Sequence, residues 1–203
     1  MEPAEISDED LLAQCQDGSI RSFETLLLRY QPRVLRFHEN QLGNLEDAKD
    51  VTQQTFLQVH DKLSRFKLGK PFSPWLFTIA RRQGIDFLRQ IGSRKRAIDK
   101  LSSEDKATPP TDPQQSLSQR EEVDRIWQWI QSNLDERSAQ ILWLRIQEEF
   151  DLSAIAKVMN LSQGNVKVLI HRARKLLLET FPIKGAPKRI SNLVKIAPQP
   201  TTK

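Results

Sequence analysis

Hydrophobic residues recur every three or four positions through most of the chain, and no alternating apolar–polar run is long enough to predict a strand. Residues 101–122 interrupt this pattern with three prolines, many Ser, Thr and Gln, and almost no large apolar side chain. Such a stretch cannot bury enough surface to offset the entropy lost on ordering, so we predict a flexible linker. The pattern predicts an all-α protein with two small helical domains, at 1–98 and 123–181, a linker at 99–122 and a tail at 182–203.

The first segment begins with two amphipathic stretches. Leu11, Leu12 and Cys15 share one face of a short predicted helix, in which Cys15 is most simply a small buried hydrophobe. A second helix follows through Tyr30, and Pro32 separates it from a further helical stretch.

A strongly amphipathic helix is predicted after the polar turn around Gly43. Its apolar face is formed by Ala48, Val51, Thr55, Val59 and Leu63. Its other face is polar and acidic and includes Asp47, Asp50, Gln53 and Gln54. A loop with several Gly and Pro residues then leads into a helix predicted from Trp75 to Arg89.

The second segment contains the pattern of a helix-turn-helix. Asp151 is placed to cap a short apolar helix, Asn160 can adopt the left-handed conformation that a tight turn needs, and Ser162 can cap the next helix. Ala156 is small enough for two helices to cross closely at its position. Asp135 is placed to cap the helix that precedes this unit.

The second helix of this unit presents a basic and polar outer face. Lys and Arg can neutralise phosphates or read guanine, and Asn and Gln can pair with adenine edges in the major groove. The candidate DNA-contacting residues are Gln163, Asn165, Lys167, His171, Arg172, Arg174 and Lys175. The alternative is an ordinary solvated surface helix, which the preceding short helix and turn disfavour.

Charge is distributed unevenly along the 203 residues, although the net charge is only +5. Residues 1–60 hold 5 basic and 11 acidic side chains, whereas residues 61–100 hold 11 basic and 3 acidic ones. Residues 161–181 and 182–203 are again basic. This distribution suggests one surface for a basic partner and two for a polyanion.

Several classes of protein are disfavoured by composition. The single Cys excludes an intrachain disulfide, and three scattered His leave no Cys/His set for zinc. The start of the chain has no apolar signal region, and no stretch approaches the about 20 apolar residues that cross a bilayer. We therefore expect a cytoplasmic protein with no metal, no cofactor and no membrane insertion.

Aromatic and basic side chains are interleaved after the predicted acidic helix. Aromatic rings that stack unpaired bases, flanked by cations along the backbone, suit single-stranded nucleic acid. The candidates are Phe66, Lys70, Phe72, Trp75, Arg81, Arg82 and Arg89. The alternative is that the aromatic rings form the domain core, which we favour for Trp75 and leave open for Phe72 and Phe77.

Five runs of sequence carry a family resemblance. They are DAKDVTQQTFL at residues 47–57, FSPWLFTIAR at 72–81, IDFLR at 85–89, LDER at 134–137 and LSQGNVKVLIHRAR at 161–174. In this order and spacing the chain resembles the extracytoplasmic-function sigma factors of bacterial RNA polymerase. The resemblance implies two helical domains, of which the first docks on the polymerase clamp and opens the −10 promoter element while the second reads the −35 element as duplex. It also implies an anti-sigma protein as a further candidate partner.

The resemblance assigns roles to particular residues. Polymerase contacts fall on Asp47, Asp50, Gln53 and Gln54. The loop at residues 66–74 falls where a flipped −10 base is held, and Arg81, Arg82 and Arg89 fall along the opened strand. The −35 contacts fall on Lys167, Val168, His171 and Arg172.

This chain also departs from the family pattern at several positions. Gln54 stands where an acid is usual, His60 where Trp is usual, Arg82 where Asn is frequent and Glu149 where Gly is frequent. Val168 replaces a usual small polar residue at a base-facing point. The preferred promoter sequence therefore cannot be transferred from the family.

Two other hypotheses compete with a sigma factor. A dimeric helix-turn-helix regulator would bind duplex DNA without polymerase, but it leaves the aromatic and basic block unexplained. A DNA-processing enzyme would need metal ligands such as Asp47, Asp50 and Asp86, yet no nucleophile–base pair, Gly-rich phosphate loop or metal-spaced cluster supports one.

Overall fold

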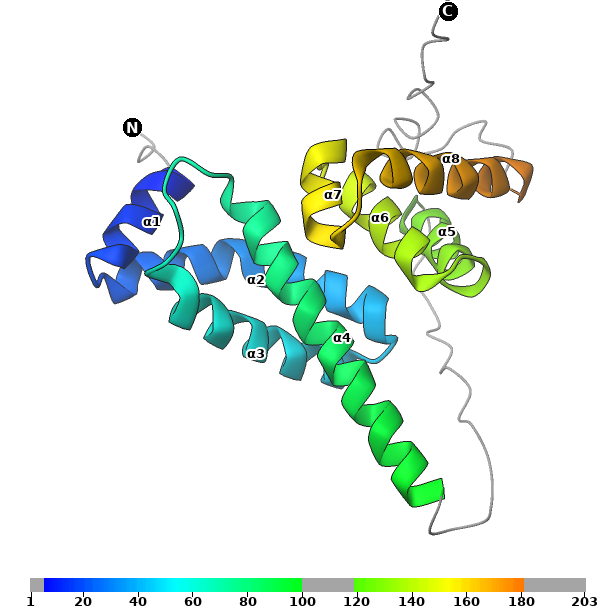
Figure 1. Cartoon of the computed structure of the whole chain (residues 1–203), viewed down its shortest axis with the longest axis horizontal. Coiled ribbons are helices and arrows are strands. Elements are labelled where there is room, and N and C mark those ends of the chain that lie inside the picture. The colour runs from blue at the N-terminus through cyan, green and yellow to red at the C-terminus, as the bar shows by residue number, and fades with distance from the viewer. Residues whose placement is uncertain (1–5, 100–118, 181–203) are drawn as a thin grey trace, which may run out of the picture. The chain divides into compact units, whose positions relative to one another are not determined.

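The computed structural model describes residues 6–99 and 119–180, and every regular element in these ranges is an α-helix. The chain divides into unit 1, Met1–Pro110, and unit 2, Thr111–Lys203. Unit 1 contains α1 (Asp8–Gln16), α2 (Ile20–Leu42), α3 (Leu45–Leu63) and α4 (Phe72–Asp99), and unit 2 contains α5 (Gln119–Asn133), α6 (Glu136–Ile146), α7 (Leu152–Met159) and α8 (Gln163–Thr180) (Figure 1). The predicted all-α class with two helical parts is confirmed.

The predicted linker and tail fall largely beyond this description. Helix α4 continues to Asp99 and α5 begins at Gln119, so regular structure enters both edges of the predicted linker. The remaining linker residues, 100–118, and the predicted tail at 182–203 lie outside the described residues.

Helix α2 runs without a break past Pro32, so the prediction of a separate helical stretch after this proline was wrong. Pro32 lacks the amide proton that would bond one turn back, at a cost of about 3 kcal/mol or more. The apolar face on both sides of it is buried, including Leu26, Tyr30, Val34 and Phe37. Burial of large side chains contributes roughly 1.5–3 kcal/mol each, which outweighs the lost bond.

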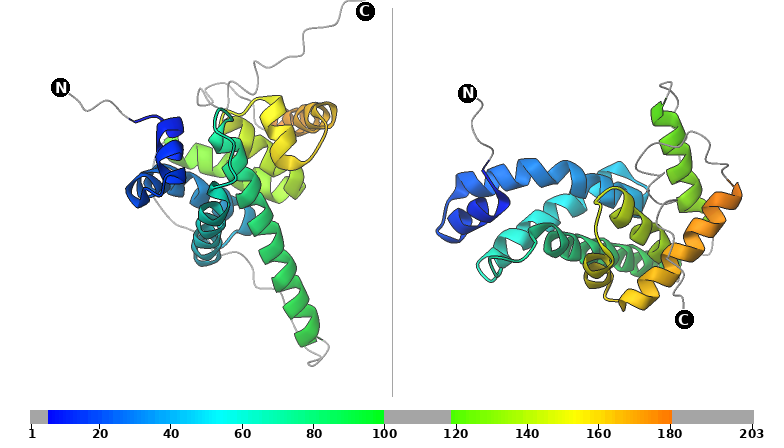
Figure 2. Two further views of the ribbon diagram at one scale, coloured as in Figure 1. Left: turned by 60° about the vertical axis from the view of Figure 1, so that its left-hand side comes forward. Right: turned by 90° about the horizontal axis from the view of Figure 1, so that it is seen from above.

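The core of unit 1 forms where α2 packs against α3 and α4, with α1 covering α2 and α3. Leu76 and Phe77 of α4 and Val34 and Phe37 of α2 are fully enclosed there. Cys15 is only half-buried, rather than buried as predicted, and the partial burial raises the pKa of its thiol. Figure 1 and the left view of Figure 2 show the C-terminal half of α4 extending past the other helices of unit 1.

Helix α4 begins about one turn earlier than predicted, at Phe72 instead of Trp75. Pro74 therefore lies in the first turn of the helix, where its missing amide proton costs nothing because the first amides of a helix have no intrahelical partner.

The caps predicted in unit 2 are confirmed. The side chain of Asp135 accepts a hydrogen bond from the amide of Ser138 at 3.1 Å, and Asp151 accepts one from the amide of Ala154 at 2.6 Å. Each cap satisfies one of the free amides at a helix start.

The helix-turn-helix is formed by α7, a tight turn and α8. Asn160 is left-handed, with φ 54° and ψ 51°, as predicted. The amide of Leu161 donates to the carbonyl oxygen of Ala156 at 2.9 Å, which is the bond that closes a Schellman turn. Ser162 Oγ then accepts from the amide of Asn165 at 3.2 Å and caps α8.

Among the described helices, none is both long and apolar enough to cross a membrane.

Candidate polymerase and nucleic-acid interfaces

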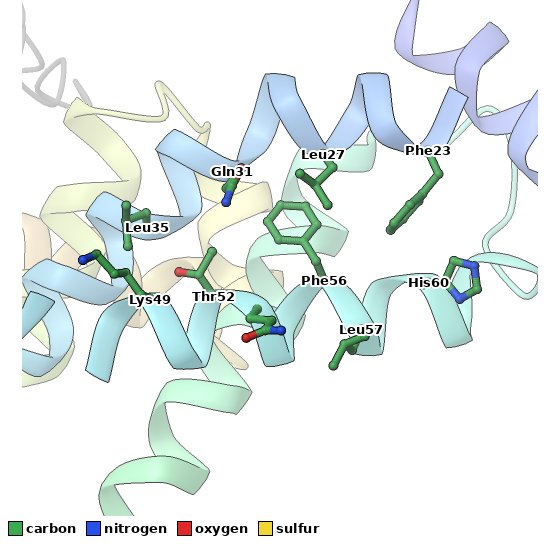
Figure 3. A pocket seen from close by; sticks show the side chains of 10 residues that line it. Phe23, Leu27, Gln31, Leu35, Lys49, Thr52, Phe56, Leu57 and His60 are labelled. Atoms are coloured by element: carbon green, nitrogen blue, oxygen red, sulfur yellow. The ribbon is translucent and has the colours of Figure 1, made fainter. Parts of the chain in front are cut away.

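A groove of about 410 Å³ opens to solvent between α2 and α3 (Figure 3). Thr52 and Phe56 of α3 form its buried floor. Phe23 and His60 lie at one end with ring centroids 5.1 Å apart in an edge-on contact. The complete lining is Phe23, Leu27, Gln31, Leu35, Lys49, Thr52, Gln53, Phe56, Leu57 and His60. The groove is therefore mainly apolar, with polar groups along its rim.

The four residues predicted to contact polymerase lie on α3. Asp50, Gln53 and Gln54 are exposed and Asp47 is half-buried, and Gln53 lines the groove. The wall that α2 contributes to the groove was not predicted from the sequence. A signal for it existed in Phe23, Leu27 and Leu35, which stand four and eight residues apart on one stripe of α2 and remain half-buried.

The aromatic residues of the second candidate site form a cluster beneath the loop between α3 and α4. The ring of Phe66 lies 5.8 Å from that of Phe72 and 5.0 Å from that of Trp75, and Tyr30 contacts Phe72 at 5.2 Å. Phe66 and Phe72 are buried, Phe77 is fully buried and Trp75 is half-buried. The alternative left open for Phe72 and Phe77 is therefore decided in favour of the core, while Trp75, which we expected in the core, is only half-buried. The buried Phe66 and Phe72 are not freely exposed for stacking, because these rings pack on one another and support the loop.

The loop itself exposes cations above this cluster. Lys67 and Lys70 are exposed, and the amide of Lys70 donates to the carbonyl oxygen of Lys67 at 3.3 Å across a turn in which Gly69 has φ 77°. A non-glycine side chain at this φ would strain the turn.

Tyr30 links the aromatic cluster to both neighbouring helices. Its hydroxyl donates to the carboxylate of Asp8, which also pairs with Arg29. Burial and the adjacent Asp8 carboxylate raise the pKa of Tyr30. On the ring face, the guanidinium of Arg33 lies 4.8 Å from the Tyr30 centroid and donates to Ser73 Oγ at 3.4 Å, which holds the start of α4.

The basic residues of α4 are arranged around one acid. Arg82 and Arg89 are exposed and lie 3.8 Å and 3.5 Å from the carboxylate of Asp86, whereas Arg81 is half-buried. Exposed ion pairs of this kind contribute little to stability. Both arginines can therefore exchange Asp86 for a phosphate at small cost.

The outer face of α8 is open to solvent over most of the predicted residues. Those exposed are Gln163, Asn165, Lys167, Val168, His171, Arg172 and Lys175. Lys175 lies 4.0 Å from Glu179. Arg174 is half-buried, so it is less available than predicted. The opposite face is buried through Val166, Ile170, Ala173 and Leu177, and Leu169 beside them is half-buried.

Comparison with known proteins identifies both units. Residues 26–94 match the family model for sigma-70 region 2, and residues 132–177 match the model for sigma-70 region 4. The RNA polymerase sigma factor CarQ of Myxococcus xanthus is 34% identical over 169 residues, which cover 81% of this chain and 91% of CarQ. The chain belongs to the sigma-70 family. It is an extracytoplasmic-function sigma factor, which directs promoter-specific initiation by RNA polymerase.

Further relatives support the same assignment along the length of this sigma factor. SigW of Bacillus subtilis, an extracytoplasmic-function sigma factor, is 25% identical over 177 residues, covering 82% of this chain and 92% of SigW. Among solved structures, CnrH in complex with the cytosolic domain of CnrY gives a TM-score of 0.64 at 25% identity, over 88% of this chain and 99% of that one. The alternative of a regulator without a polymerase role is not favoured, because unit 1 matches region 2.

One family departure has a clear structural correlate in this sigma factor. Glu149, at a position where Gly is frequent in the family, has φ 56° and is exposed.

The metal ligands that a DNA-processing enzyme would need are not brought together. Within residues 6–99 and 119–180 no group of three or more His, Cys, Asp or Glu side chains is placed to hold a metal ion.

Proposed function

We propose that this sigma factor binds core RNA polymerase through the groove between α2 and α3. The observation that carries this proposal is an apolar groove left open to solvent beside the exposed Asp50 and Gln53. An apolar centre with a polar rim is the usual anatomy of a protein interface. Asp47 and Gln54 extend the rim along α3 toward a basic surface of the polymerase clamp.

We further propose that the loop at residues 66–74 and α4 bind the melted −10 strand. Lys67 and Lys70 offer cations on the loop, and Arg81, Arg82 and Arg89 follow along α4. Phe66, Phe72 and Trp75 support the loop from below, and the half-buried Trp75 leaves part of its ring for a base.

The −35 element is assigned to α8 as duplex DNA. Lys167, His171 and Arg172 are exposed on the outer face of a helix that follows a short helix and a tight turn. This is the placement through which a recognition helix enters the major groove. Gln163, Asn165 and Val168 lie near its N-terminal end, where base contacts concentrate.

We assign the protein no catalysis of its own, because polymerase performs the chemistry and the sigma factor lowers the cost of strand opening. Its place of action is then the cytoplasm. CnrH is described in complex with the cytosolic domain of CnrY. We propose that an anti-sigma protein binds this chain and covers its groove.

Core binding by two matched leucine variants tests the groove. Leu57 lines it and is 53% exposed, whereas Leu28 lies outside it on α2 and is 71% exposed. Leu57→Glu is expected to weaken binding of the full chain to core polymerase at least about tenfold, while Leu28→Glu leaves it within about twofold. Equal effects of the two substitutions would exclude the groove as the docking surface.

A further inference from the structure

The side chain of Gln16 ties the end of α1 to the loop between α3 and α4. Its Nε2 donates to the carbonyl oxygen of Leu63 at 3.0 Å and to that of Phe66 at 2.7 Å. These contacts join residues 47 and 50 positions apart in the sequence. Figure 1 shows the loop passing beside α1 before α4 begins.

The chemistry of this contact fixes the orientation of the amide. Both partners are carbonyl oxygens, so only the two N–H groups of Gln16 can face them. Leu63 is the last residue of α3, and its carbonyl oxygen accepts from the amide of Phe66 at 3.0 Å as well as from Gln16. Gln16 therefore caps α3 from another helix and holds the first residues of the loop in place.

The two ends of the loop are held by different contacts. Gln16 holds the backbone at Leu63 and Phe66, and Arg33 donates to Ser73 Oγ at the start of α4. Between these points Lys67, Leu68, Gly69 and Lys70 are exposed. The segment that would meet the melted strand is thus short and fixed at both ends.

We propose that Gln16 is a positioning residue for −10 recognition, although it lies outside the loop and outside the basic face of α4. By fixing the backbone at Leu63 and Phe66, it presets the path of residues 67–70, so that the opened strand binds a loop that is already ordered. This inference rests on the proposed role of the loop in binding the −10 strand. Preordering of a binding segment reduces the entropy lost on binding.

A matched pair of substitutions on α1 separates loop positioning from helix stability. Gln16→Met keeps the length of the side chain and removes its donors. Gln14→Met makes the same change two residues earlier. Among the described hydrogen bonds, the Gln14 side chain takes part in one, in which its Oε1 accepts from Ser22 Oγ of α2 at 2.6 Å. Trypsin cleavage of the full chain after Lys67 is expected to accelerate about tenfold in Gln16→Met and not in Gln14→Met.

The functional readout is base discrimination by the holoenzyme. Strand opening is measured by a fluorescent base analogue on a promoter selected from a random library, and on copies with single −10 substitutions. The ratio of interest is the opening rate on the selected promoter divided by the rate on its substituted copies. Gln16→Met is expected to reduce this ratio about tenfold, while the affinity of the protein for core polymerase is unchanged. Gln14→Met retains the full ratio.

A loop variant, Lys67→Ala with Lys70→Ala, distinguishes the two ways in which the inference can fail. If this variant slows opening while Gln16→Met discriminates as well as Gln14→Met, the role of Gln16 is overturned and the proposed function of the loop stands. If the loop variant also opens promoters at the normal rate, the loop is not the −10 site and both proposals fail.

Discussion

Nε2 of His38 lies 3.0 Å from Thr55 Oγ1 in the interior of unit 1. The Thr55 hydroxyl gives its own proton to the carbonyl oxygen of Val51 at 2.7 Å, so it accepts from His38. His38 is consequently the neutral tautomer with its proton on Nε2. The imidazole is fully enclosed, and this burial lowers its pKa from 6.5 to about 4.

Acid is therefore expected to destabilise unit 1 through His38. Between pH 6.5 and 4 the unfolded chain binds a proton that the folded one excludes, so the free energy of unfolding falls as the pH falls. The loss reaches about 3 kcal/mol near pH 4, since each pKa unit corresponds to about 1.4 kcal/mol. Urea unfolding followed by NMR, which separates the two units, measures the effect.

Two variants test this origin of the pH dependence. His38→Gln is expected to remove the slope between pH 4 and 6.5, whereas replacement of the exposed His60 by Gln retains it. A slope that survives in His38→Gln would assign the acid sensitivity to other groups.

Glu149 is expected to be less favourable than glycine at its position. A φ of 56° costs an L-residue other than glycine roughly 1–2 kcal/mol. Replacement by glycine recovers only part of this free energy, because glycine loses more conformational entropy on folding. Glu149→Gly should stabilise unit 2 by about 0.5–1 kcal/mol in urea unfolding. Glu149→Ala also removes the carboxylate but keeps the strain, so it should give no gain. Equal stabilisation by both would attribute the effect to charge.

Two glycines of α4 are expected to respond differently to replacement by alanine. A Cβ at Gly92 meets nothing within 4 Å, so Gly92→Ala should stabilise the helix by about 1 kcal/mol. A Cβ at Gly84 would lie 2.0 Å from Oε1 of Gln41 on α2. Gly84→Ala therefore forces the Gln41 side chain out of its packed position and loses that gain.

A double-mutant cycle tests whether contact with the Gln41 side chain causes the loss seen in Gly84→Ala. Gln41→Ala combined with Gly84→Ala should recover most of the benefit of alanine in the helix, giving a coupling of about 1 kcal/mol in thermal unfolding. Additive effects of the two substitutions would show that the close approach of α2 and α4 is relaxed in other ways.

Much of the fold was predictable because its signals are local. The caps at Asp135, Asp151 and Ser162 depend on residues three positions away, and the turn at Asn160 depends on one backbone conformation. The path of α2 through Pro32 was not predictable in this way, since burial against α3 and α4 decides it.

The candidate sites also differ in whether local or long-range contacts determine them. The exposed face of α8 follows from helical period alone, and all but one of its predicted residues are exposed. Phe66 and Phe72 could not be placed from sequence, because aromatic rings among cations are equally typical of a base-stacking surface and of a small core. The contacts of Gln16 join distant parts of the chain and leave no local pattern.

Loss of two cations on α8 is expected to weaken −35 binding and its salt dependence. Lys167→Ala with Arg172→Ala should reduce holoenzyme affinity for duplex −35 DNA about 10-fold to 100-fold. If both contact phosphates, the slope of log affinity against log salt becomes shallower by about 1–2. Arg125 is exposed on α5, and Arg125→Ala should change neither the affinity for −35 DNA nor the salt slope.

In vitro transcription tests the sigma role most directly. Sigma-free bacterial core polymerase is supplied with a library of promoter fragments and with this protein, either unchanged or carrying Lys167→Ala with Arg172→Ala. We predict promoter-dependent transcripts that require the protein and weaken with the double substitution. An absence of transcripts, with the protein alone binding duplex DNA at moderate salt, would contradict the account and favour a regulator that acts without polymerase.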